Sequence, residues 1–197
     1  LAPNTAYTAS VKVADVNGNL MSAPTTWTLT TTATTTCPCS LFSTATVPTV
    51  VATNDPHPYE LGVRFTPSVH GTISGVTFYK AAQNTGTHTA NLYTATGTLL
   101  ATGTFTGESA SGWQTMTFSS PVTVTAGTAY VASYTTTVGF YSGDNGYFNK
   151  TAVNNPNLVA GLNVAGKANG VFTAGSGFPK TNFGGSNYWV DVIFNNS

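Results

Sequence analysis

Short runs in which apolar and polar residues alternate constrain the fold of this chain more than any other feature. The run "YELGVRF" (59–65) places three apolar side chains on one face of an extended strand and polar or small residues on the other. The runs "GWQTMTF" (112–118) and "NYWVDVIF" (187–194) alternate in the same way. Similar runs recur roughly every eight to twelve residues, with turn-forming residues between them. The pattern predicts an all-β fold, an antiparallel β-sandwich or barrel.

The composition agrees with this prediction. Charged residues make up only 6% of the chain, whereas aromatic residues make up 12%. Most polar positions are filled by Thr, Ser, Asn and Gly, of which Thr favours strands and Gly and Asn favour turns. The chain therefore has enough apolar residues to form a core, and a β-rich one.

The charge balance argues against several classes of partner. Six basic and six acidic residues give a formal net charge of zero, so the chain has no basic footprint for nucleic acid or anionic lipid. No apolar run approaches the roughly 20 residues that cross a bilayer, so we expect no membrane insertion. The sequence shows no initiator Met and no signal-peptide pattern, which favours a processed product or a fragment. Thr-rich, uncharged β-proteins suit an extracellular setting.

The N-terminal segment resembles part of a known sandwich. "LAPNTAY" (1–7) is similar to the entry into the penultimate strand of fibronectin-III-like and bacterial Ig-like domains, in which a tyrosine at the position of Tyr7 forms the tyrosine corner. We therefore expect residues 1–32 to be the last two strands of an incomplete Ig-like domain. A hairpin alone is marginally stable in water. The missing strands are removed, are supplied by another molecule, or are replaced by docking on the rest of the chain.

A Thr-rich linker with the sequence Cys-Pro-Cys is expected over residues 33–40, before a domain spanning 41–197. Cys37 and Cys39 are the two cysteines of the chain. A disulfide between them is sterically feasible and fits an oxidising compartment. An intermolecular disulfide, free thiols and a soft-metal site are the alternatives.

Several runs together resemble one bacterial family, domain of unknown function 4082, over residues 37–195 approximately. They are "CPCSLF", "ELGVRF", "TISGVTFYK", "NTGTHTANLY", "TGTLLATGTFTGE", "SGWQTMTF", "PVTVTAGTAYVASY", "ANGVF" and "SNYWVDVIF". The resemblance implies a jelly-roll-like antiparallel β-sandwich in secreted or cell-surface bacterial proteins, often beside Ig-like repeats. It implies no reaction.

Aromatic residues in a Gly- and Asn-rich run suggest a ligand site. The run "VGFYSGDNGYF" (138–148) combines aromatic residues, expected to be exposed on a loop, with carboxylate and amide groups. A ring covers the apolar face of a sugar, and the polar groups bind its hydroxyls. The alternative is that the rings pin long loops to the sandwich. The candidate ligand-binding residues are Phe140, Tyr141, Asp144, Asn145, Tyr147 and Phe148. The rings of Phe172, Phe178 and Phe183, in a second Gly-rich segment, are further candidates for the same site.

A second candidate site is a structural calcium ion. "TNDPHPYE" (53–60) offers the oxygen ligands Asn54, Asp55 and Glu60, and calcium binds oxygen ligands. The alternative is that the segment only forms turns. No other cofactor is expected.

The sequence indicates no catalytic machinery. It lacks a complete nucleophile motif and has only six acidic residues, of which Glu60 and Glu108 are the conceivable glycosidase pair. We therefore expect a non-catalytic extracellular module that binds polysaccharide or acts in adhesion. The alternative is a structural subunit of a surface fibre whose residues 1–32 pair with a neighbouring copy.

Overall fold

The computed structural model describes residues 5–31 and 37–196. The chain divides into two compact units, Leu1–Thr35 and Thr36–Ser197, and each is described by itself. Among the described residues, no helix is long and apolar enough to cross a membrane.

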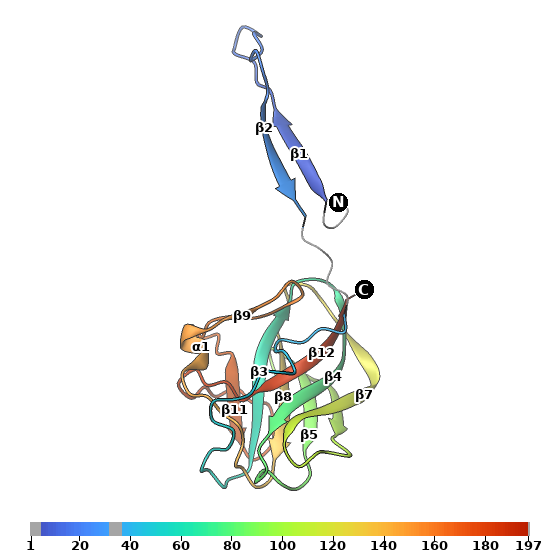
Figure 1. Cartoon of the computed structure of the whole chain (residues 1–197), viewed down its shortest axis with the longest axis vertical. Coiled ribbons are helices and arrows are strands. Elements are labelled where there is room, and N and C mark those ends of the chain that lie inside the picture. The colour runs from blue at the N-terminus through green and yellow to red at the C-terminus, as the bar shows by residue number, and fades with distance from the viewer. Residues whose placement is uncertain (1–4, 32–36, 197) are drawn as a thin grey trace. The chain divides into compact units, whose positions relative to one another are not determined.

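The first unit is a β-hairpin. Strand β1 (Ala6–Val11) pairs antiparallel with β2 (Thr25–Thr30), in a register that places Tyr7 opposite Leu29 (Figure 1). In the connection between the two strands, the carboxylate of Asp15 accepts the backbone N–H groups of Asn17 and Asn19. All six residues of β2 are exposed, so the hairpin has no core of its own.

The described residues of the second unit, 37–196, form ten strands and one short helix. Figure 1 shows their arrangement. They are β3 (Tyr59–Pro67), β4 (Gly71–Lys80), β5 (Thr89–Thr94), β6 (Leu99–Thr104), β7 (Gly112–Val124), β8 (Tyr130–Thr136), α1 (Tyr147–Lys150), β9 (Val153–Asn154), β10 (Leu158–Ala160), β11 (Gly170–Ala174) and β12 (Val190–Asn196).

The strands form two antiparallel sheets. The larger sheet has the order β6-β5-β8-β3-β10-β9, and β11 also pairs with β3. The smaller sheet has the order β12-β4-β7. The prediction of an all-β fold built as an antiparallel sandwich is confirmed.

The core lies between the inner faces of the two sheets, as the alternation of the sequence predicts. In β3 the apolar residues Leu61, Val63 and Phe65 are each 1% exposed. Phe78 of β4 stacks on Tyr134 of β8, with ring centroids 3.9 Å apart, which joins the smaller sheet to the larger one. Fully buried rings with this geometry contribute strongly to stability.

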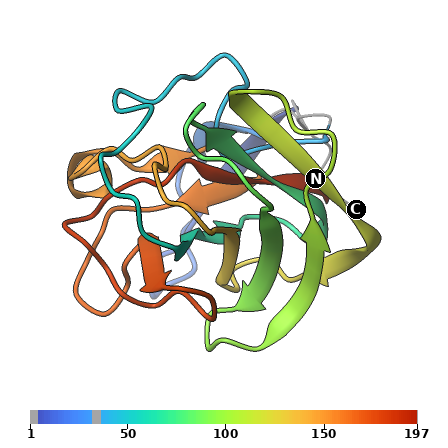
Figure 2. The same cartoon turned by 90° about the horizontal axis from the view of Figure 1, so that it is seen from below.

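A long loop, residues 43–58, precedes β3 and runs along one side of the sandwich (Figure 2, cyan). The two residues before the loop are bound to β12, because the carboxylate of Asp191 accepts the backbone N–H groups of Leu41 and Phe42 at 2.7 and 2.8 Å. Just before it, Cys37 and Cys39 form a disulfide with each other, which confirms the first of the pairings considered above. The loop is thus anchored at its start before it reaches the end of the sheets.

Candidate functional site

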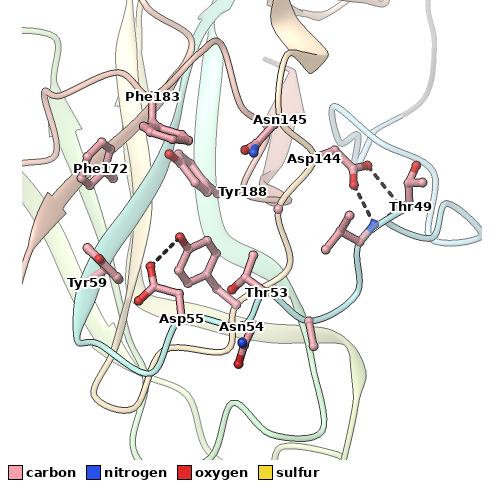
Figure 3. Close-up of a pocket in the computed structure, with 14 residues that line it drawn as sticks. Thr49, Thr53, Asn54, Asp55, Tyr59, Asp144, Asn145, Phe172, Phe183 and Tyr188 are labelled. Carbon is pink, nitrogen blue, oxygen red and sulfur yellow. Dashed lines mark hydrogen bonds between the residues drawn. The ribbon is translucent and has the colours of Figure 1, made fainter.

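An open pocket of about 830 Å³ lies where this loop meets the ends of the strands (Figure 3). Its walls come from the loop before β3, from the segment after β8, from β11 and from the residues around the start of β12. The lining residues are Thr49, Val50, Ala52, Thr53, Asn54, Asp55, Tyr59, Tyr141, Gly143, Asp144, Asn145, Phe172, Phe183 and Tyr188.

Four aromatic rings form a closed cycle in one wall of the pocket, which we call the aromatic quartet: Tyr59, Tyr141, Tyr188 and Phe172. Tyr59 contacts Tyr141 and Phe172 edge to face, with centroids 5.6 and 5.9 Å apart. Tyr188 contacts the same two rings at 5.8 and 6.3 Å. Because each ring is held by two others in the preferred geometry, the wall is rigid without a ligand.

The strand pattern explains how these rings meet. Tyr59 begins β3 and Phe172 lies in β11, which pairs with β3 and places Phe172 opposite Leu61. Tyr188 precedes β12 of the other sheet. The quartet therefore continues the core out to the end of the sandwich.

The tyrosine hydroxyls of the pocket stay protonated over the physiological range. Burial raises the pKa of Tyr188 to about 12. Burial also raises the pKa of Tyr141 and Tyr59, and the nearby Asp55 carboxylate adds to the effect. Each phenol thus remains both a hydrogen-bond donor and an acceptor.

Asp55 is the carboxylate closest to the quartet. It accepts hydrogen bonds from the imidazole of His57 at 2.6 Å and from the hydroxyl of Tyr141 at 3.2 Å (Figure 3). Partial burial acts to raise its pKa, but the bonds from His57 and the two neighbouring tyrosine hydroxyls outweigh it and lower the pKa. Asp55 is therefore an ionised acceptor at neutral pH.

Asp144 stabilises the pocket loop. Its two carboxylate oxygens accept the backbone N–H groups of Thr49 and Val50, at 3.0 and 2.7 Å (Figure 3). The neighbouring amide of Asn145 accepts a hydrogen bond from the hydroxyl of Ser186 at 2.8 Å. Both residues reach the pocket wall, with their oxygens already engaged in holding it.

The structure brings together only part of the predicted ligand-binding set. Tyr141, Asp144 and Asn145 line the pocket, and Tyr147 lines a smaller adjacent cavity of about 270 Å³ that shares Asp144 and Asn145. Phe140 lines neither cavity. Phe148, another residue of the predicted set, lies in α1 and is fully buried in the core.

Sequence reasoning missed two members of the quartet, Tyr59 and Tyr188. Both stand at the outer end of an alternating run, "YELGVRF" and "NYWVDVIF". The sequence signal for such a pocket residue is an aromatic residue that stands at the end of a strand and continues the strand's apolar face. Core-facing positions at the end of a sheet border the loops.

The expected calcium ligands do not assemble. Asn54 and Asp55 line the pocket, but Glu60 follows Tyr59 in β3 and points to the opposite face of the sheet. There its Oε1 accepts bonds from Asn91, Tyr93 and Ser133. No group of three or more His, Cys, Asp or Glu side chains gathers in a metal-binding arrangement within the described parts of the chain.

The two glutamates considered as a glycosidase pair lie in separate networks. Glu60 is held on the outer face of the larger sheet, whereas Glu108 pairs with Lys80 at 2.8 Å and with buried His88 at 2.8 Å. Neither lines the pocket.

No curated protein matches the chain. A family model described as a domain of unknown function matches residues 45–190. This range covers β3 to the start of β12, with most of the pocket loop and all four rings of the quartet. The chain therefore belongs to the DUF4082 family.

Proposed function

We propose that the second unit is a non-catalytic carbohydrate-binding module and that the pocket holding the aromatic quartet binds the sugar. The observation that carries the proposal is this rigid wall of rings beside a carboxylate, amides and hydroxyls in one open pocket. Aromatic faces accept the apolar C–H face of a pyranose, and polar side chains bind its hydroxyl groups.

Phe183 is the ring best placed to stack on a sugar. It is 60% exposed and stands at the pocket edge beside Phe172 and Tyr188 (Figure 3). The quartet rings contribute mainly their edges and hydroxyls, since they pack on one another. An exposed ring beside a fixed wall is able to stack on a sugar without reorganisation of the site.

The polar side of the pocket supplies hydrogen-bond partners. Asp55 is an ionised acceptor, and the amide of Asn54 lies on the same loop. The hydroxyl of Thr53 is buried at the pocket wall and has no partner among the described residues. An unpaired buried hydroxyl is costly, and this one is out of contact with solvent, so a sugar hydroxyl reaches it only if the pocket wall shifts.

Replacement of Phe183 by alanine should weaken binding to the retained polysaccharide about tenfold or more, because a stacking ring contributes roughly 1.5 kcal/mol or more. Retention on insoluble polysaccharides and a glycan array identify the ligand, and titration calorimetry with its oligosaccharide measures the loss. Phe183 is exposed, so the free energy of unfolding should stay unchanged.

Leu99→Ala is the matched control, because Leu99 is 49% exposed and lies on β6, outside the pocket. The control variant should bind as the unmodified protein does. A protein that is retained on no glycan, or a Phe183→Ala variant that binds unchanged, contradicts the proposal.

A secreted or cell-surface location accompanies this proposal. The Cys37–Cys39 disulfide persists in oxidising compartments and is rare in the bacterial cytoplasm. Polysaccharide ligands of the proposed kind are also found outside the cell.

The hairpin supports a second candidate function, assembly with a neighbouring copy. On β2, Trp27 and Leu29 are 48% and 54% exposed, and Val11 of β1 is 46% exposed. The two strands expose apolar side chains and have no core. They gain stability when another sheet covers those side chains. We propose that the hairpin of one copy completes a sheet of the next.

Deletion of residues 1–32 should therefore abolish self-association measured by sedimentation velocity. The double variant Trp27→Ser and Leu29→Ser, which keeps the backbone, should weaken self-association in the same direction. A protein that is monomeric at high concentration both before and after deletion rules this candidate out.

A further inference from the structure

A second cavity, of about 510 Å³, lies on the outer face of the larger sheet, away from the inner-face residues that form the quartet. Arg64 and Val131 line it from the paired strands β3 and β8, and Val171 lines it from β11. Its walls are completed by Ala95, by residues 163–166, 168 and 178–180, and by Asn182. We call it the outer cavity.

The outer cavity is positively charged. Arg64 and Lys180 both line it, and none of its lining residues is acidic. Neither side chain forms an ion pair among the described residues. Asp55 and Asp144 line the first pocket, and Glu108 and Asp191 do not line this cavity. Glu60 lies on the same outer face but outside the lining, and its carboxylate accepts hydrogen bonds from Asn91, Tyr93, Ser133 and Gly177.

The floor of the outer cavity is apolar and fixed. Val131 and Val171 are buried and form a small cluster with Tyr93, against which Phe178 packs. The ring of Phe178 meets that of Tyr93 edge to face at 5.4 Å. The same cavity is therefore lined by two cations that form no ion pair among the described residues and by an apolar floor.

The loop over the cavity is held in place by the sheet. Pro179 lies against Gly62, where an added Cβ would be 3.3 Å from the proline ring. The side-chain amide of Asn182 donates to the carbonyl of Gly170 at 3.1 Å. The backbone N–H of Gly177 donates to the buried carboxylate of Glu60 at 2.8 Å. The wall that carries Lys180 is thus built into the fold.

We propose that the outer cavity binds a small carboxylate ligand that has an apolar body. The guanidinium of Arg64 offers a planar pair of donors that matches a carboxylate, and Lys180 adds a second positive charge. The apolar part of the ligand covers the floor formed by Val131, Val171 and Phe178. The proposal is independent of sugar binding, since the two cavities share no residue.

The test uses benzoate as the probe and follows backbone amide shifts of the full chain by NMR. Benzoate should shift the amides of residues 163–168 and 178–182, with a dissociation constant on the order of 1–10 mM for so small a ligand. Benzamide, which has the same ring without the charge, should bind at least tenfold more weakly. Inorganic phosphate, which has charge without an apolar body, should also bind more weakly than benzoate.

Substitutions assign the effect to the two cations. Arg64→Gln should weaken benzoate binding about tenfold, and Arg64→Lys should have an intermediate effect because it keeps the charge and loses the paired donors. Lys180→Gln should weaken binding several-fold. The matched control is Lys12→Gln, which removes one charge from the other unit and should change nothing.

Three results would overturn the proposal: no amide shifts at 50 mM benzoate, equal affinity for benzamide, or unchanged binding in Arg64→Gln. Each variant first needs an amide spectrum that retains the dispersion of the unmodified protein, so that a folding defect is recognised. If Arg64→Gln fails this requirement, the test rests on Lys180→Gln, because Lys180 is exposed on a loop. Unchanged benzoate binding by Lys180→Gln then overturns the proposal.

Discussion

Replacing Asp191 with alanine is expected to lower the free energy of unfolding by about 3 kcal/mol, measured by urea denaturation. Asp191 is 2% exposed, and its two oxygens accept three backbone N–H groups, from Leu41, Phe42 and Val192. Alanine leaves these donors without partners in a buried place. The change also releases the segment that leads into the pocket loop.

Asp191→Asn keeps the shape of the side chain and removes its ionisable group. One carboxylate oxygen becomes an NH₂ group, which faces a backbone N–H donor and repels it. We expect a loss of about 2 kcal/mol at pH 5, smaller than the loss in the alanine variant. Asp144→Asn is the control, since Asp144 accepts similar backbone bonds at an exposed site and should cost less.

The pH dependence of this difference tests the burial of Asp191. Burial raises its pKa to about 7, even though the three N–H groups favour the ionised form and act to lower it. The folded state therefore binds more protons than the unfolded state between about pH 4 and 7, so the contribution of Asp191 to stability decreases as the pH rises through this window. The asparagine variant lacks this slope.

The advantage of the unmodified protein over Asp191→Asn should therefore shrink between pH 5 and 7, by up to about 1.4 kcal/mol per pH unit. Burial lowers the pKa of His88, whose contribution to stability falls as the pH drops below about 6.5. That opposite slope is present in both proteins and cancels in the comparison. A difference that does not change with pH contradicts the raised pKa.

The sandwich could be predicted from sequence because its evidence is local. In a run such as "YELGVRF", successive side chains point to opposite faces of a strand, so a period of two assigns Leu61, Val63 and Phe65 to the core. The same rule places Glu60 on the face of the strand opposite to the side chain of Tyr59. It does not place Asp55, which lies in the loop before the strand, so the alternation alone did not exclude the expected calcium site.

The pocket could not be assembled from sequence in the same way. The aromatic quartet joins rings at positions 59, 141, 172 and 188, and only the pairing of β11 with β3 and the packing of the two sheets bring them together. Phe140 and Phe148 stand in the same Gly- and Asn-rich run, yet only Phe148 is fully buried. The difference depends on a single turn of helix, α1, which has too few residues to show a period.

Gly139→Ala is expected to destabilise the protein by about 3–4 kcal/mol and to abolish the proposed sugar binding in the molecules that remain folded. Gly139 has φ +74°, a conformation that costs an L-residue roughly 1–2 kcal/mol. An added Cβ would also overlap the carbonyl oxygen of Asp55 and lie 2.7 Å from the backbone nitrogen of His57. The pocket loop would have to move away from the segment after β8.

The movement would break a specific contact of the site. The backbone N–H of Phe140 donates to the carbonyl of Asp55 at 2.8 Å, and Asp55 in turn accepts the hydroxyl of Tyr141. Displacing Asp55 therefore removes an acceptor from the pocket and frees one ring of the quartet. Binding should fall even under conditions in which urea denaturation shows the variant to be folded.

Gly127→Ala is the matched control, because Gly127 has φ +73° and no atom within 4 Å of an added Cβ. It carries the same conformational cost without the overlap, so we expect a loss of about 1–2 kcal/mol and unchanged binding. Equal losses of stability in the two variants would mean that the conformation of Gly139, and not its contact with Asp55, determines the effect. Unchanged binding by Gly139→Ala would mean that the position of the pocket loop does not determine ligand affinity.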